Sequence, residues 1–192
     1  VKEGLRAADS ALVVLSGRSG VSVGTEQVFN FAKQKGVPIM FFVNKLDDDR
    51  GDYTKTLEQM KEVFGKGVTP FVYPIKENGE FQGFVDIVDM TARRYEGLDR
   101  VEIPVPEGMA DTVAPLREMI MEAVAETDEE LMVKYFNGEE FTFDEIKKAI
   151  RKGVKEGSIY PVYCGAGLTN IGIRSLADGI GKYLPAPSEI EE

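Results

Sequence analysis

Two short apolar runs, separated by a helical segment, constrain the fold of this chain more than any other feature. Residues 11–15 (Ala-Leu-Val-Val-Leu) and 39–43 (Ile-Met-Phe-Phe-Val) contain no polar residue. Uninterrupted runs of this length are typical of strands buried on both faces of a parallel sheet. Between them, residues 25–35 place Val28, Phe29 and Ala32 on one helical face. The sequence therefore predicts an α/β fold with a doubly wound parallel sheet.

The α/β alternation continues, is interrupted, and then resumes. Residues 53–64 predict a second amphipathic helix, and residues 159–164 and 171–183 predict a further strand and helix. Between these parts, residues 66–157 carry only short β-like pieces, at 71–73, 81–84 and 85–88, followed by three helices. We expect those helices at 107–126, 128–136 and 143–155, the last with the capping-box pair Thr142 and Glu145 at its start.

This interruption predicts the organisation of the chain. We expect a core formed by residues 1–65 and 158–187, and an inserted α+β subdomain at 66–157. We expect residues 188–192 to begin a linker, because Pro185 and Pro187 follow the last predicted helix and mark a domain boundary.

Composition excludes several classes of chemistry. The chain has no histidine and a single cysteine, Cys164. Ser-His-Asp triads, Cys-His nucleophiles, His-ligated zinc, multi-cysteine metal sites and internal disulfides are therefore excluded. A lone cysteine is typical of a reducing compartment, which predicts a cytoplasmic location. No run of about 18 apolar residues predicts a membrane span.

Acidic residues concentrate in the predicted insertion. Residues 66–157 hold 20 acidic and 12 basic residues, a net of −8, while the whole chain has a net charge of −10. Binding to nucleic acid needs clustered Lys and Arg, so this negative charge favours a protein partner over direct contact with nucleic acid. The acidic surface is interpreted either as a solvated helical face or as a dedicated partner face.

The second apolar run ends at Asn44-Lys45-Leu46-Asp47. Ligands bind beyond the carboxyl ends of strands in such sheets. Guanine presents its N1–H and 2-amino group as adjacent donors that one carboxylate accepts together, whereas adenine has an acceptor at N1 and no 2-amino group. Asp47 is suited to this discrimination, Asn44 to the N7 and O6 edge, and Lys45 to laying its methylene stem over the base. The tetrapeptide predicts a guanine site; the alternative interpretation is a chance turn.

A second loop is expected at the same edge of the sheet. Residues 164–168 (Cys-Gly-Ala-Gly-Leu) follow the predicted strand at 159–164, and a backbone N–H there is placed to meet guanine O6. The candidate nucleotide-binding residues are Asn44, Lys45, Asp47, Ala166, Gly167 and Leu168. We predict no catalytic residue and no metal ligand in this chain.

Phosphate-binding motifs are absent from the 192 residues. No stretch matches G-x-x-x-x-G-K-[ST], the loop that cradles nucleotide phosphates. Two Asp-x-x-Gly sequences, at Asp48–Gly51 and Asp178–Gly181, are interpreted as chance matches. Phosphoryl transfer depends on positioning and charge stabilisation, so we predict that this chain reads the base of GTP or GDP without binding the phosphates.

The order of these motifs resembles bacterial translation elongation factor G, within its GTP-binding domain. The resemblance extends over essentially all 192 residues, including the insertion, which small Ras-like GTPases and most other translational GTPases lack. It is carried by Ser19–Val21, Thr25–Glu26, Val43–Asp47, Phe81–Asp86, Asp128–Met132, Lys134–Phe136, Gly138–Glu140, Pro161-Val162 with Cys164-Gly165, and Tyr183–Pro187.

This resemblance implies a partial Ras-like P-loop NTPase core, from a GTPase that acts on the ribosome in translocation or recycling. It implies that the phosphate loop and switches lie upstream of Val1, that Mg²⁺ binds only with that upstream segment, and that further domains follow Glu192. It also implies that the insertion faces the ribosomal stalk proteins. Two alternatives stay open: a non-catalytic module that binds stalk or other proteins, and a related ribosome-associated GTPase with a different task.

The chain departs from the pattern of elongation factor G in three segments. Ser16-Gly17 stands where the family usually has Asp-Ala, Gly24 where it often has Gln, and Ala166-Gly167-Leu168 where it has Ser-Ala and an apolar residue. Ala166 lacks the hydroxyl that would steady the base-reading Asp, whereas the Gly167 N–H is retained. These departures imply a divergent paralogue.

Overall fold

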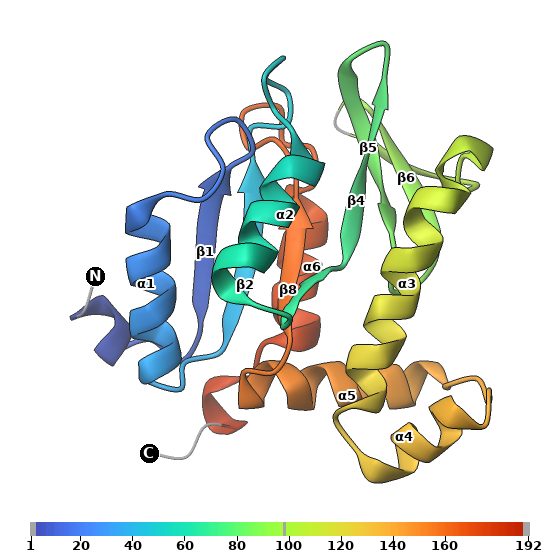
Figure 1. The fold of residues 1–192 in the computed structure, drawn as a ribbon. Coiled ribbons are helices and arrows are strands. Elements are labelled where there is room, and N and C mark those ends of the chain that lie inside the picture. The colour runs from blue at the N-terminus through green and yellow to red at the C-terminus, as the bar shows by residue number, and fades with distance from the viewer. Residues whose placement is uncertain (1–2, 98, 190–192) are drawn as a thin grey trace.

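The computed structural model describes residues 3–97 and 99–189, and its centre is a four-stranded parallel sheet. The strands lie in the order β1 (Ala11–Ser16), β2 (Ile39–Asn44), β8 (Tyr160–Cys164) and β3 (Val68–Pro70). Helices α1 (Val23–Gln34) and α2 (Tyr53–Phe64) cover one face, and α6 (Ile173–Tyr183) covers the other (Figure 1). The predicted α/β class with a parallel sheet is confirmed.

Burial explains why the two apolar runs form neighbouring strands. Every residue of β8 is buried, and so is every residue of β2 except its last, Asn44. The register pairs Ser16 with Asn44 and Val43 with Cys164. The three strands therefore end side by side, and the loops that follow them emerge at one edge.

Side-chain caps set the starts of the two helices over the sheet. The Ser22 hydroxyl accepts a hydrogen bond from Thr25 N, so α1 begins two residues earlier than predicted. The Asp52 carboxylate accepts from Lys55 N at 3.0 Å, which starts α2 where the sequence predicts it. Inside, the Phe29 and Phe64 ring centroids are 4.5 Å apart. This aromatic contact packs the two helices onto β2.

The chain between β3 and β8 contains a second, antiparallel sheet. Its strands lie in the order β4 (Val72–Glu77), β5 (Glu80–Asp86), β6 (Thr91–Glu96) and β7 (Asp99–Ile103). The predicted pieces at 71–73, 81–84 and 85–88 correspond to β4 and β5. The sequence did not predict β6 and β7, because charged residues lie on both faces of these strands and obscure the apolar alternation.

Three helices complete this inserted region: α3 (Ala110–Ala125), α4 (Glu129–Phe136) and α5 (Phe143–Glu156). Short 3-10 turns lie at Gly4–Arg6, Glu107–Met109 and Pro187–Glu189. The capping box is confirmed, since Thr142 Oγ1 accepts from Glu145 N and Glu145 accepts from Thr142 N. In the described part of the chain, no helix combines the length and apolar character that crossing a membrane requires.

The parallel sheet extends into residues that the sequence prediction assigned to the insertion. Strand β3 pairs with β8, with Val68 opposite Tyr160, although residues 66–157 were predicted as inserted. A three-residue strand is too short to show a periodicity. Phe71 then links the two sheets, because its N–H donates to Val162 O and its carbonyl accepts from Ile87 N. The core sheet therefore includes residues 68–70, and the antiparallel sheet begins at Val72.

One apolar cluster runs through both regions. It joins Phe41 and Val162 of the parallel sheet to Ile120, Val124 and Ile150 of the inserted helices. At the other end, Glu189 forms an ion pair with Arg151 at 2.6 Å, within the start of the predicted linker. Val1, Lys2 and residues 190–192, which were assigned to the core and the linker, lie outside the described residues.

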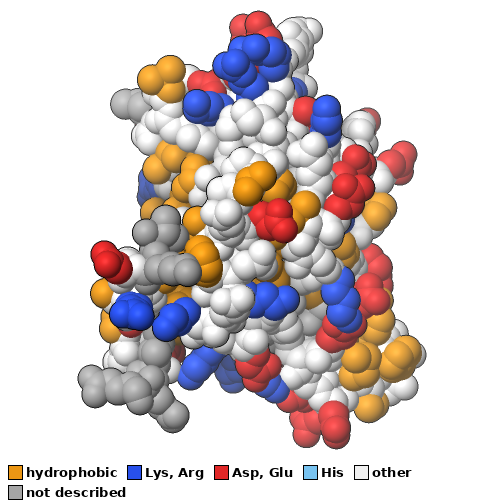
Figure 2. All heavy atoms as spheres, turned by 60° about the vertical axis from the view of Figure 1, so that its left-hand side comes forward, with side chains coloured by type: hydrophobic (Ala, Val, Ile, Leu, Met, Phe, Trp, Pro, Cys, Tyr) orange, Lys and Arg blue, Asp and Glu red, His pale blue; other side chains and the backbone are white. Residues whose placement is uncertain are grey.

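The face turned forward in Figure 2 mixes side chains of both charges. Lys and Arg appear there in small groups among acidic and hydrophobic side chains, not as one continuous patch. Strand β1 lies at an edge of the parallel sheet, and Leu12 and Val14 on it are 39% and 53% exposed. This edge therefore presents apolar side chains in the described structure.

Candidate functional site

The two strand-end loops predicted to form a site are joined by direct hydrogen bonds. Asn44 Oδ1 accepts from Gly167 N at 2.8 Å and from Lys45 N at 2.8 Å. Leu46 N donates to the Gly165 carbonyl at 3.2 Å. These bonds connect the ends of β2 and β8 because the parallel register brings the two strands to the same edge. The structure thus brings together Asn44, Lys45 and Gly167, as expected.

Within the first loop, apolar and charged side chains point in opposite directions. Lys45 adopts a left-handed backbone conformation, with φ of 65°. Leu46 is 1% exposed and anchors the loop in the core. Asp47 is exposed, and among the described residues its carboxylate has no hydrogen bond or ion pair. The loop therefore presents one free carboxylate beside a fixed amide side chain.

The next acidic residue, Asp48, has a local structural role. Its Oδ1 accepts from Arg50 N at 2.9 Å, and its carboxylate lies 3.5 Å from the guanidinium groups of Arg18 and Arg50. The backbone N–H of Arg50 and these two positive charges lower the pKa of Asp48. Gly51 N donates to the Asp48 carbonyl at 2.8 Å. The Asp48–Gly51 match is therefore a local turn in which the Asp48 carboxylate already has partners.

The second loop is tightly packed up to Ala166 and open after it. A Cβ on Gly165 would lie 2.4 Å from the Ile171 carbonyl oxygen, so only glycine fits there. Ala166 is fully buried, and its N–H donates to that carbonyl at 2.9 Å. Leu168 is 94% exposed, so its side chain projects into solvent. Of the three predicted residues in this loop, Gly167 has the most direct contact with Asn44.

The hydrogen bond made by the Gly167 N–H differs from the expectation that this group faces guanine O6. The Gly167 N–H, expected to face the base, already donates to Asn44 Oδ1. The Asn44 Nδ2 group makes no hydrogen bond among the described residues. A base carbonyl at this edge would compete with Asn44 Oδ1 for the Gly167 N–H.

A third loop, the one that follows β1 and contains Gly17, also contacts the first loop, although sequence reasoning did not assign it to the site. Gly17 N donates to the Asn44 carbonyl at 2.8 Å, and the Gly17 carbonyl accepts from Asp52 N at 3.0 Å. A Cβ on Gly17 would lie 2.6 Å from Leu46 Cδ2. The position appeared in the sequence only as a departure from the family, and no pattern in the sequence indicated this contact.

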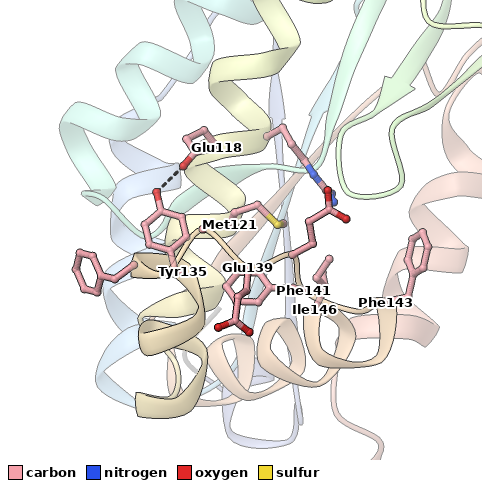
Figure 3. Close-up of a pocket in the computed structure, with 11 residues that line it drawn as sticks. Glu118, Met121, Tyr135, Glu139, Phe141, Phe143 and Ile146 are labelled. Carbon is pink, nitrogen blue, oxygen red and sulfur yellow. Dashed lines mark hydrogen bonds between the residues drawn. The ribbon is translucent and has the colours of Figure 1, made fainter.

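A separate cavity of about 730 Å³ lies among α3, α4 and the start of α5. Met121, Phe141 and Ile146 line it, and the Tyr135 hydroxyl donates to Glu118 at its edge (Figure 3). That hydrogen bond raises the pKa of Tyr135 to about 12. In the described part of the chain, no cluster of three or more acidic, Cys or His side chains is arranged to hold a metal.

Comparison with known proteins assigns the chain to a family. Residues 1–186 match the family model of the elongation factor Tu GTP binding domain. The chain belongs to this family. Family membership identifies it as a GTP-binding domain of the translational GTPases and implies that it binds a guanine nucleotide.

A solved structure shows the same fold in a longer protein. The GTP-binding domain superposes on a crystal structure of a protein from Thermus thermophilus with a TM-score of 0.91 and 38% sequence identity. The match covers 98% of this chain and 28% of that one. The domain thus spans a little over a quarter of the relative's length.

Proposed function

We propose that this domain reads the guanine base for a GTPase that acts on the ribosome in translocation or recycling, as elongation factor G does. In this proposal the cytoplasmic parent protein hydrolyses GTP. This chain contributes Asn44, Lys45 and Asp47 with the loop from Ala166 to Leu168. Phosphate and Mg²⁺ binding require a segment with the motif that these 192 residues do not contain.

The hydrogen bond between Asn44 Oδ1 and Gly167 N carries the proposal. It fixes an amide side chain between two loops at the carboxyl edge of a parallel sheet, where nucleotides bind in such folds. Asp47 lies three residues further on, exposed and without a partner in the described structure. A free carboxylate beside a fixed amide matches the two donors of guanine N1–H and the 2-amino group.

Substitution of Asp47 tests the base contact. We expect Asp47→Asn to weaken GDP binding by about 1–3 kcal/mol, the cost of leaving buried polar groups without partners. Xanthine carries an oxygen where guanine has its 2-amino group, so the same variant should gain affinity for xanthosine diphosphate. NMR titration of the isotope-labelled domain at millimolar nucleotide measures both effects.

Asp49→Asn provides the matched control, because Asp49 is also exposed and the charge change is identical. We expect it to leave the preference for GDP unchanged. The assignment of Asp47 is wrong if Asp47→Asn keeps the wild-type preference, or if Asp49→Asn changes it equally.

We propose a second function for the inserted region, as a surface that binds ribosomal stalk proteins. Phe136 and Phe143 line the cavity of Figure 3 and are 79% and 71% exposed. Exposed aromatic residues are enriched at protein interfaces.

Calorimetric titration with purified stalk proteins tests this second function. We expect Phe136→Ser combined with Phe143→Ser to abolish binding. Val23→Ser, which changes an equally exposed side chain on α1, should preserve it. Absence of binding by the folded wild-type domain would contradict the role.

A further inference from the structure

Three hydrogen bonds connect the antiparallel sheet to the segment that leads from the base-reading loop into α2. The Tyr53 hydroxyl donates to the Val72 carbonyl at 2.9 Å. Thr54 Oγ1 and the Tyr73 hydroxyl are 2.9 Å apart. Lys76 Nζ donates to the Gly51 carbonyl at 2.7 Å. All three join strand β4 to residues 51–54.

The last of these contacts reaches the base-reading loop itself. Gly51 is buried, and a Cβ on it would lie 2.8 Å from the Lys45 carbonyl oxygen and 2.9 Å from that of Asp48. Gly51 is therefore packed closely against the Lys45 and Asp48 carbonyls, which lie before and after Asp47 in the chain. A shift of Gly51 must move the loop that carries the Asp47 carboxylate.

Strand β4 has a register irregularity directly before Lys76, the residue that contacts Gly51. The pairing of β4 with β5 shifts register between Ile75 and Lys76. Such a shift bends a strand and redirects the side chain at that point. Lys76 consequently extends away from its own sheet to the turn after the base-reading loop, where its ammonium group meets a buried carbonyl.

We propose that Lys76 is a positioning residue for guanine recognition, which acts by holding Gly51 and with it the Asp47 loop. The inference rests on the proposed role of Asp47 in reading the base. It adds that the antiparallel sheet is part of the guanine site, because Lys76 acts on the Asp47 loop through Gly51. Because coupling between sites is reciprocal, a partner that displaces β4 changes guanine affinity, and guanine changes the affinity for that partner.

The GDP/IDP preference tests the proposal, since inosine diphosphate differs from GDP only in lacking the 2-amino group. The ratio of the two dissociation constants therefore reports the Asp47 contact and cancels general effects on folding or phosphate binding. We expect Lys76→Met, which keeps the methylene stem, to reduce this preference by about three- to tenfold, the net contribution of a typical hydrogen bond. Lys76→Arg retains a donor and should restore the preference.

Lys152→Met is the matched control. Lys152 Nζ also donates to a backbone carbonyl, that of Thr127 at 2.6 Å, but among the inserted helices. We expect this variant to keep the wild-type preference. If Lys76→Met also keeps it, the role of Lys76 is overturned while the proposed function stands. If wild type binds GDP and IDP equally, the proposed function itself fails.

Discussion

At the scale of single residues, glycine positions distinguish packing from ligand access. A Cβ on Gly165 would lie 2.4 Å from the Ile171 carbonyl and 2.9 Å from the Phe42 ring. We expect Gly165→Ala to lower the free energy of unfolding by about 1–3 kcal/mol, as overpacking does. Urea denaturation measures this change.

Gly167 offers the comparison in the same loop. A Cβ there would be no closer than 3.5 Å to Asn44, which is an ordinary contact distance. Gly167→Ala should therefore leave the unfolding free energy within about 0.5 kcal/mol of wild type. Equal destabilisation by the two substitutions would show that the loop is not packed as described.

Sequence reasoning at this scale identified the residues of the first loop but not their bonding. The position of Asn44 and Asp47 at a strand end was predictable because they follow an uninterrupted apolar run, and their role in reading guanine stays a prediction. The bond from Gly167 N to Asn44 Oδ1 was not, since it joins residues 123 positions apart. The support from Gly17 depends on a close approach to Leu46 that only the folded backbone shows.

At the scale of elements, local signals predicted helices better than strands. Helix α5 begins after the predicted capping box, and α2 covers the predicted residues 53–64. Strands β6 and β7 escaped prediction because Arg93 and Arg94 put a half-buried charged side chain on each face of β6, which removes the apolar alternation. Strand β3 escaped because pairing with β8, not its own sequence, defines it.

The cap of α5 predicts a pH-dependent stability. Glu145 accepts from Lys134 Nζ at 2.6 Å and from Thr142 N at 2.8 Å, and these bonds lower its pKa to about 2. A depressed carboxyl pKa means that the stabilisation is complete above the ordinary value near 4.5 and is lost as the pH falls toward 2. Glu145→Gln should therefore lower the melting temperature at pH 7 and have no effect near pH 2.

Glu140→Gln serves as the control for this titration, because Glu140 is exposed and makes no hydrogen bond in the described structure. Its melting temperature should follow wild type at every pH. A Glu145→Gln difference that persists unchanged to pH 2 would contradict the assigned role of the carboxylate.

At the scale of the whole molecule, the two regions share one apolar cluster and several polar contacts. Arg100 of β7 lies 3.1 Å from Ser175 Oγ and 3.3 Å from Asp178 on α6, and Lys182 lies 3.5 Å from Asp89. The antiparallel sheet thus contacts both α2 and α6, the helices that follow the two strand-end loops. The change of pattern at residue 66 predicted an insertion, but not that it packs beside the site.

This shared core predicts cooperative unfolding. We expect slowly exchanging amides in β2 and in α5 to open with the same free energy in native-state hydrogen exchange, because Phe41 and Ile150 belong to one buried cluster. Exchange of the inserted helices at a much lower free energy than β2 would show that the two regions fold independently.

We propose that the sheet edge formed by Asn44, Asp47 and Gly167 reads guanine. The most direct measurement compares GDP and ADP titrated into the isotope-labelled domain, with amide shifts followed by NMR. We predict that GDP moves the amide signals of Lys45 to Asp48 and of Gly167, whose N–H must exchange Asn44 Oδ1 for the base. ADP at the same concentration should leave them in place. Equal shifts with ADP, or GDP shifts confined to other residues, would contradict the account.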